Sequence, residues 1–234
     1  MAILNVSNLN KSFGIDNILE DVNFLIEEKD KIGLVGLNGA GKSTLLQILA
    51  GKITYDSGDL SIERDIKVGY LAQGAKFESH KTIGEALSSI FQEQQYQEKE
   101  LRELETLMSS PEVYEDESRL ESLMNRYSTL FEDFKTSGGF EVQSRIRGVL
   151  RGLGFDDEDT PISNLSGGQK TRLALGQVLL ESPDLLLLDE PTNYLDLESI
   201  QWLEGFLKDY TKALLVVSHD RYFLDNVTTK IFEL

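Results

Sequence analysis

Eight residues in the first quarter of the chain have the composition and spacing of a phosphate-binding loop. The string GLNGAGKS fills residues 36–43, follows the apolar run Lys31 to Val35 and precedes the helix-like segment Lys42 to Ala50. Its glycines let the backbone curl so that N–H groups point at an anion, and the helix adds the positive end of its dipole. In such a loop Lys42 reaches the β- and γ-phosphates and the Ser43 hydroxyl holds Mg²⁺. This order favours a phosphate-binding loop over a chance glycine turn.

Two adjacent carboxylates follow an aliphatic run in LLLLDEP, residues 185–191. Four aliphatic residues indicate a buried strand, and ligands bind at the carboxyl ends of strands in parallel sheets. We expect Asp189 to bind the Mg²⁺ shell, through water, and Glu190 to accept a proton from an attacking water. Alone, the string could be an exposed strand end, but its presence beside a phosphate loop favours a site.

A second glycine turn, LSGGQ at residues 165–169, begins the helix-like segment KTRLALGQVLL. Ser166 and the N–H groups of Gly167 and Gly168 could together bind an anion at the start of that helix. Taken alone, the string is equally well explained as a glycine turn with a serine cap. With it, one chain carries two candidate phosphate-binding helix starts, at Gly41 and Gly168.

Four further residues are weak signals when each is considered alone. Gln73 could be a solvated loop residue, and His219 could be a surface histidine after a strand. Asp196 could be a helix cap, and Phe13 could belong to the core rather than form a platform for adenine. Their value as site residues comes from their order along the chain.

The elements that must position these residues follow from hydrophobic patterning. The last third alternates helical segments with continuous aliphatic strands, which indicates a parallel sheet covered on both faces. Near the N-terminus, short apolar runs at Ile3 to Val6 and Val22 to Ile26 alternate with polar turns. These runs predict a small β-rich layer, so the expected fold class is α/β with a β layer at the N-terminus.

Between Ile83 and Phe134 the hydrophobic period becomes helical. A first stripe consists of Leu87, Phe91, Leu101, Leu104 and Met108, and a second of Leu120, Leu123, Tyr127, Leu130 and Phe134. Pro111 separates them, which predicts an antiparallel helical hairpin over residues 88–137, here called the arm. Both helices could instead lie against the globular body, but narrow stripes with charged flanks favour a projecting hairpin.

Composition restricts the compartment and the partners. The chain has no cysteine, a net charge of −17 and no signal-peptide pattern, and its longest aliphatic run, Leu185 to Leu188, is too short to cross a bilayer. We expect a cytoplasmic protein without membrane insertion. The arm has 12 acidic residues against 5 basic ones, so it is not a basic arm for phosphate docking.

Together the strings resemble the nucleotide-binding domain of the ABC superfamily, in the family's order and over nearly all of residues 1–234. This resemblance implies an ATPase that uses ATP and Mg²⁺. It implies a P-loop NTPase parallel sheet core with an N-terminal antiparallel β layer, a helical subdomain and the inserted hairpin arm. The implied nucleotide-binding residues are Phe13, Gly36, Leu37, Asn38, Gly39, Ala40, Gly41, Lys42, Ser43, Thr44 and Gln73.

The same resemblance assigns the remaining roles. Glu190 and the switch histidine His219 are catalytic, and Asp196 belongs to the D-loop. The metal-binding residues are Ser43, Gln73 and Asp189. The signature residues Ser166, Gly167, Gly168 and Gln169 act on the ATP of an opposite domain.

Within the superfamily, LSGGQKTRLAL, EPTN-x-LD and SHDRYFLD resemble the ABC-F branch, whose members act on ribosomes. An arm before the signature is typical of the first of the two ABC domains in that branch. Tyr194 departs from the branch, which usually has histidine there. ABC-F proteins join two such domains by a long linker, and Leu234 lies where that linker starts. We therefore expect the first domain of a longer protein.

The implied partners are a second ABC domain, in the same longer chain or in a homodimer, and the ribosome with its rRNA. The implied role lies in translation or antibiotic resistance. The alternative is the soluble ATPase subunit of an ABC membrane transporter, which the arm and the EPTN and SHDR strings disfavour. A third reading, a nucleotide-gated scaffold without catalysis, is disfavoured by the intact Asp189, Glu190 and His219.

Overall fold

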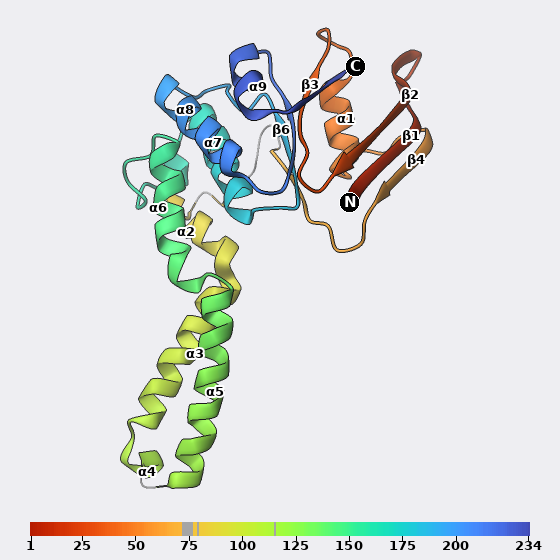
Figure 1. Cartoon of the computed structure of the whole chain (residues 1–234). Helices are drawn as coiled ribbons and strands as arrows, with labels where there is room; N and C mark the ends of the chain where they lie inside the picture. The colour runs from red at the N-terminus through yellow and green to blue at the C-terminus, as the bar shows by residue number, and fades with distance from the viewer. Residues whose placement is uncertain (72–76, 79, 115) are drawn as a thin grey trace.

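The computed structural model describes residues 1–71, 77–78, 80–114 and 116–234. Figure 1 shows a globular body from which two long helices extend as a narrow arm. The strands are β1 (Ala2–Phe13), β2 (Asp16–Glu27), β3 (Lys31–Val35), β4 (Ser57–Ile62), β5 (Val68–Tyr70), β6 (Leu185–Asp189), β7 (Ala213–Val217) and β8 (Lys230–Glu233). The helices are α1 (Lys42–Leu49), α2 (Ile83–Ser88), α3 (Gln92–Met108), α4 (Pro111–Tyr114), α5 (Glu117–Thr136), α6 (Val142–Gly152), α7 (Gly167–Glu181), α8 (Leu197–Asp209) and α9 (Arg221–Val227).

The central sheet has the strand order β5-β6-β7-β3-β8, and its strand pairs are parallel. Every residue of β6 and β7 is buried, which explains their continuous aliphatic sequences. Alternate residues serve two cores. Leu185 and Leu187 pack with α1 and the N-terminal β layer, whereas Leu186 and Leu188 pack with the helices of the opposite face.

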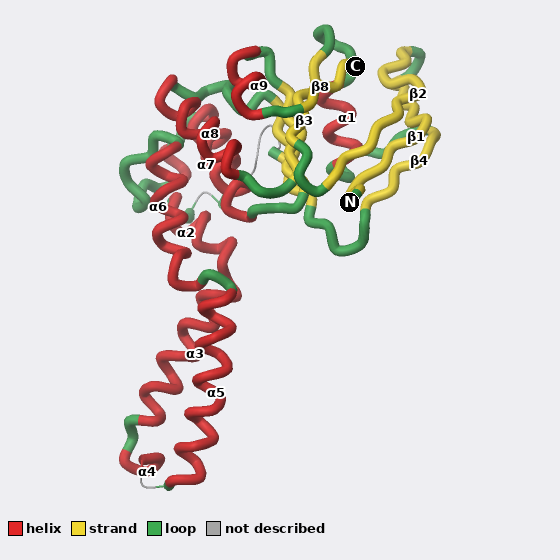
Figure 2. The backbone as a smooth tube through the Cα atoms, viewed as in Figure 1, coloured by secondary structure: helices red, strands yellow, loops and turns green. Residues whose placement is uncertain are grey.

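The second sheet, β2-β1-β4, is antiparallel and lies beyond α1 from the central sheet (Figure 2). Strands β1 and β2 form a long hairpin whose last pair joins Phe13 to Asp16. Gly14 in the tight turn has φ 63°, a left-handed conformation that glycine adopts without strain. The α/β fold class with a parallel sheet and an antiparallel layer is therefore confirmed.

Helices α2, α6, α7 and α8 form a helical region beside the central sheet (Figure 1). Helix α2 begins with a capping box in which Thr82 and Glu85 each accept a hydrogen bond from the other's backbone N–H. Its buried Ile83 and Leu87 join the same core as α6 and α7. No helix in the described part of the chain combines the length and apolarity needed to span a membrane.

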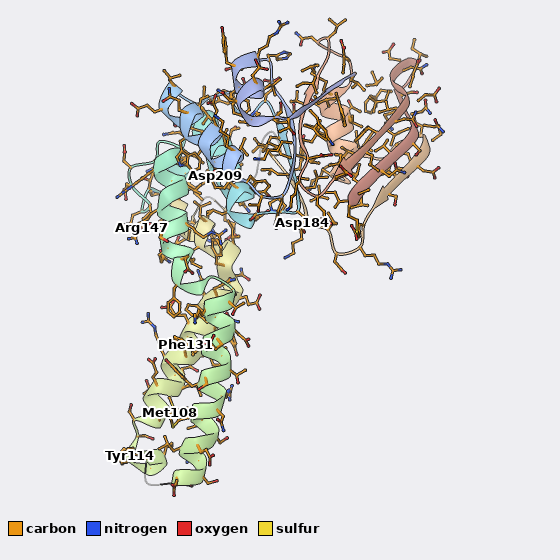
Figure 3. The ribbon with its side chains drawn as sticks, in the orientation of Figure 1. Met108, Tyr114, Phe131, Arg147, Asp184 and Asp209 are labelled. Atoms are coloured by element: carbon orange, nitrogen blue, oxygen red, sulfur yellow. The ribbon has the colours of Figure 1, made fainter. Side chains whose placement is uncertain are left out.

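The arm consists of the antiparallel helices α3 and α5, with the short helix α4 at its outer end (Figure 1). Figure 3 shows Tyr114 at that outer end and Phe131 closer to the body. Leu101 and Leu104 are buried in the seam between the helices. Near the body, Phe140 packs edge-on against Phe131 and Phe134.

The first hydrophobic stripe divides between the two regions, contrary to its assignment to one arm helix. Leu87 and Phe91 belong to the core of the body, whereas Leu101 and Leu104 lie in the arm. The helical run is interrupted at Ser89–Phe91, a 3₁₀ turn after which α3 starts in a new direction. Hydrophobic spacing continues through that turn, so the sequence pattern does not show the change of packing partner.

Candidate functional site

The phosphate loop is fixed by the strand before it and the helix after it. Helix α1 begins at Lys42 with Gly41 as its N-cap, at φ 92°. A Cβ at Gly41 would lie 2.8 Å from side-chain carbons of Ile18 and Leu19, so a larger residue meets both strain and a clash. Leu45 and Leu46 are buried and anchor α1 in the core. The first N–H groups of α1 therefore point from a rigid position toward any bound anion.

Lys42 lies against this loop and is only 8% exposed. Its Nζ donates hydrogen bonds to the carbonyl oxygens of Gly36, at 3.0 Å, and Leu37, at 2.9 Å. These two bonds hold the ammonium within the curl of the loop. A phosphate oxygen is a stronger acceptor for an ammonium than a neutral carbonyl, so an anion can draw the same donor.

Two carboxylates stand at the end of β6. Asp189 pairs with Val217 of β7 and is 5% exposed. Glu190 follows with φ 50°, an uncommon left-handed conformation that turns the chain sharply out of the strand, and its N–H donates to the Val217 carbonyl at 2.9 Å. Burial raises the pKa of the Glu190 carboxyl above its usual 4.5, and the nearby His219 partly opposes that rise.

His219 follows β7 and contacts Glu190 through both backbone and side chain. Its N–H donates to Glu190 Oε2 at 3.3 Å, and its Nε2 lies 3.4 Å from Oε1. Glu190 is 16% exposed, and its buried Oε1 accepts no hydrogen bond from the described residues. A mostly buried carboxylate with one oxygen left over is suited to accept a proton from a water molecule.

These residues meet at one cavity of about 280 Å³. It is lined by Phe13, Ile18, Asn38, Gly39, Gly41, Lys42, Ser43, Thr44, Asp189, Glu190, Val217 and His219. Gly36, Leu37 and Ala40 belong to the same loop but do not line the cavity. Larger hollows exist, such as one between β2 and β8, but they lack the phosphate loop and the two carboxylates. Gln73 lies outside the described residues.

Phe13 is 53% exposed at the edge of this cavity, so it is not a core residue. Asp196 stands elsewhere, as the N-cap of α8, where its side chain accepts the Ser199 N–H at 2.8 Å. That hydrogen bond lowers the pKa of Asp196. The helix-cap interpretation of Asp196 therefore describes its contacts within this chain.

The signature turn lies outside the cavity and is solvent-exposed at Ser166 and Gly167. Ser166 caps α7 in a second capping box: its Oγ accepts the Gln169 N–H at 3.3 Å, and its own N–H donates to Gln169 Oε1 at 2.9 Å. Gly168 lies against Tyr194, whose ring carbon would be 3.1 Å from a Cβ at that position. The α7 start is thus exposed to solvent and does not line the cavity beside the phosphate loop of its own chain.

Sequence reasoning did not identify Ile18 and Val217 as cavity residues, although both line it. Ile18 lies against Gly41, and Val217 ends β7 beside Asp189. Neither has polar chemistry, so the only available signal was position: Val217 ends the aliphatic run just before His219. Such apolar residues shape a site without reacting in it.

The donor set of the cavity fits Mg²⁺. Ser43 and Asp189 bring a hydroxyl and a carboxylate to the same space. Among the described residues no group of three or more His, Cys, Asp or Glu side chains is placed to hold a metal on its own. Mg²⁺ is usually held in this way, by one or two protein oxygens together with substrate phosphates and water.

Comparison with known proteins places these features in context. The family model described as ABC transporter matches residues 19–193. YdiF of Bacillus subtilis (strain 168) is 48% identical over 235 residues, covering 100% of this chain and 36% of YdiF. The energy-dependent translational throttle protein EttA of Escherichia coli (strain K12) is 40% identical, covering 93% of this chain and 38% of EttA. ABC transporter F family member 5 of Arabidopsis thaliana is 36% identical, covering 97% and 33%.

Among solved structures, an archaeal ribosome recycling factor, aABCE1, in complex with the ribosomal stalk protein aP1 matches with a TM-score of 0.69 at 28% identity. The match covers 100% of this chain and 37% of that chain. This chain therefore spans roughly a third of the length of the proteins that it resembles, between 33% and 38% for those compared.

Proposed function

This chain belongs to the ABC transporter family of ATP-binding domains, and from that membership we propose that it hydrolyses ATP at the cavity beside Lys42. One observation carries the proposal: the phosphate loop, Asp189, Glu190 and His219 line the same cavity, although they come from distant parts of the sequence. Together they supply donors for phosphate, a carboxylate for Mg²⁺ and a base for water.

In this proposal the triphosphate lies against the N–H groups at the start of α1, with Lys42 beside its β- and γ-phosphates. Glu190 takes a proton from the attacking water, and His219 keeps the carboxylate oriented through its contacts at 3.3 and 3.4 Å. The raised pKa of Glu190 makes its carboxylate a stronger base than a solvent-exposed carboxylate. The products are ADP and phosphate.

Mg²⁺ fits as the metal cofactor, held by Ser43 and Asp189, with Gln73 as a further ligand by family resemblance. Bound there, Mg²⁺ neutralises charge on the phosphate oxygens. Asp189 is almost completely buried at the end of β6, so its carboxylate is held in place by the sheet rather than by solvent.

The exposed signature turn supports a composite site. Ser166, Gly167, Gly168 and Gln169 act on ATP bound by a second ABC domain, in a longer chain or in a homodimer, and Asp196 joins that interface. A partner's signature in turn closes the cavity of this chain. An isolated domain lacks that clamp, and losing one preorganised donor typically slows catalysis by about 10²–10³-fold. We expect slow turnover by the isolated chain.

An ABC-F type role on the ribosome, in the cytoplasm, is the finer proposal. It is supported by the relatives whose names place them in translation or ribosome recycling and by the arm inserted before the signature. The role is in translation or in antibiotic resistance. Copurification with a membrane protein instead of ribosomes would favour the alternative, the ATPase subunit of a membrane transporter.

The nucleotide site is tested by calorimetric binding of Mg-ATP to Lys42→Ala and to a matched control, Lys52→Ala, whose side chain is exposed beyond α1. The first substitution removes the ammonium from the phosphate loop, so we expect at least tenfold weaker binding. The control keeps wild-type affinity. Equal affinity in all three proteins would contradict the assignment of this cavity to ATP.

The ribosome proposal is tested by replacing residues 98–133 with a short glycine linker. Gln97 borders the deletion and contacts the side chain of Ser137 at 3.3 Å, about one helical turn beyond Phe134, so a short linker can join the two ends. We expect unchanged Mg-ATP affinity and reduced cosedimentation with ribosomes. Undiminished cosedimentation would show that the arm is not the contact.

A further inference from the structure

Phe13 is held by more than its place in the β1–β2 hairpin. A phenylalanine that is half exposed at the tip of a hairpin would ordinarily exchange between rotamers, because little packs around it. Here the two residues before it are both fixed by one side chain from a distant part of the sequence, Asp56. The position of Phe13 is therefore supported by Asp56, a residue to which the proposed function assigns no role.

Lys11 is the first part of this support. Its Nζ lies 5.1 Å from the centroid of the Phe13 ring, within the range of a cation–π interaction. Its side chain is 11% exposed, although lysine usually extends into solvent. Lys11 does not line the cavity beside the phosphate loop, whereas Phe13 does. The ammonium therefore contacts the ring without lining the cavity that a ligand would enter.

Asp56 is the second part. Its Oδ1 accepts a hydrogen bond from Lys11 Nζ at 3.1 Å, and its Oδ2 accepts the Ser12 N–H at 2.7 Å. Its own N–H donates to the Asn10 carbonyl at 2.9 Å, which fixes Asp56 just before β4. The Ser12 N–H, and then Lys11, lower the pKa of Asp56, so the carboxylate is ionised at neutral pH.

We propose that Asp56 is a positioning residue for the base of the bound nucleotide, acting through Lys11 and Ser12 on Phe13. This inference rests on the proposed function. It adds to that function a residue, Asp56, that touches neither the nucleotide nor the reacting atoms. A ring that is already oriented loses less conformational freedom when a base stacks on it, so binding is tighter. The cation beside the ring also reduces the repulsion between the ring's π electrons and those of a purine.

If Asp56 acts on the base alone, its loss should affect binding of the base but not binding of the phosphates. Calorimetric affinities are measured for Mg-ATP and for magnesium tripolyphosphate, which has the phosphates but no base. We expect Asp56→Ala to weaken Mg-ATP binding by about three- to tenfold, while tripolyphosphate affinity stays within about twofold. Asp59→Ala, an exposed acid three residues further on, in β4, is the matched control and changes neither affinity.

Lys11 provides a second, independent variant should Asp56→Ala fold poorly. Lys11→Met removes the charge and keeps most of the side-chain volume, so it should reproduce the selective loss of ATP affinity. Lys11→Arg keeps a cation above the ring, so this variant should retain the wild-type ATP affinity. In a double-mutant cycle, Asp56→Ala should add nothing to Phe13→Ala, because Asp56 acts only through that ring.

Two results would overturn this inference alone: unchanged ATP affinity in Asp56→Ala and Lys11→Met, or an equal loss for ATP and tripolyphosphate. The second result indicates that the pair merely supports the fold of the whole site. A wild-type chain that binds neither ligand would overturn the proposed function and this inference with it.

Discussion

The carboxyl end of the central sheet, beside the cavity at Lys42, and the arm are stabilised in different ways. At the sheet edge, the carboxyl ends of β3, β6 and β7 bring together residues far apart in the sequence, on strands that are almost entirely buried. In the arm, α3 and α5 contact mainly each other, and their ion pairs, such as Arg126 with Glu100, are exposed on at least one side. The site therefore depends on the whole body, whereas the arm depends on local contacts.

This difference predicts which changes the protein tolerates. A side chain at the sheet edge has a position set by long-range packing, so its loss has no local remedy. An exposed arm residue is replaced at small cost, because solvent and neighbouring side chains substitute for its contacts. Substitutions at the two places should therefore differ widely in effect, with the largest loss at the sheet and the smallest on the arm.

Glu190→Gln should lower the ATP hydrolysis rate by about 10²–10⁴-fold, the usual contribution of a general base. The amide keeps the shape of the side chain but does not accept the proton, so Mg-ATP affinity should be retained. Steady-state phosphate release and calorimetry measure the two quantities. Glu198→Gln, in the exposed first turn of α8, is the control. Hydrolysis at the wild-type rate by Glu190→Gln would exclude this residue as the base.

Leu187→Ala in β6 should cost about 2–5 kcal/mol of unfolding free energy, because a fully buried leucine leaves a cavity. The matched change in the arm, Leu123→Ala, removes a half-buried side chain from α5 and should cost about 1 kcal/mol. Urea denaturation measures both. Equal losses would contradict the difference in packing between the sheet and the arm.

The Glu190 carboxyl should titrate above 4.5 in the free domain. Carboxyl NMR resonances, assigned with Glu190→Gln, give the midpoint. Because burial is the main cause and His219 opposes it, His219→Ala should raise the pKa of Glu190 further. A midpoint at or below 4.5 would contradict the burial of this group.

The same shift has a consequence for stability. A carboxyl whose pKa is raised by folding penalises the folded state once it ionises, and the penalty grows as pH rises from the unfolded pKa through the folded one. Glu190→Gln should therefore raise the melting temperature near pH 7 but leave it unchanged below about pH 4. The opposite pH dependence would contradict the direction of the shift.

Arg126→Ala should be the mildest change. It removes the ion pair with Glu100 on the arm, and such exposed pairs contribute about 0–1 kcal/mol. Urea denaturation at low and high salt should give nearly the same midpoint as the wild-type chain. A loss comparable to that of Leu187→Ala would show that the arm is stabilised by its charges.

Much of the site was predictable because its signals are local. Eight consecutive residues predict the phosphate loop, and LLLLD predicts a buried strand that ends in an acid. The division of the first hydrophobic stripe between body and arm was not predictable from the sequence. Leu87 and Phe91 keep helical spacing although they pack into the body. Their partners are set by a 3₁₀ turn at Ser89–Phe91 that the hydrophobic pattern does not record.

The support of Phe13 was equally invisible in the sequence. Asp56 and Lys11 are 45 residues apart, and they meet only because β1 pairs in the folded protein with β4, the strand that follows Asp56. Asp196 was ambiguous for a different reason: a helix cap and an interface residue can be the same side chain. Gln73 stays a prediction from family resemblance.

The most direct measurement is a crystal structure of Glu190→Gln grown with Mg-ATP. We expect the triphosphate against the N–H groups of residues 39–44, the base stacked on Phe13, and a second copy's Ser166 turn at the γ-phosphate. Nucleotide bound at another place, with the cavity beside Lys42 empty, would contradict the account.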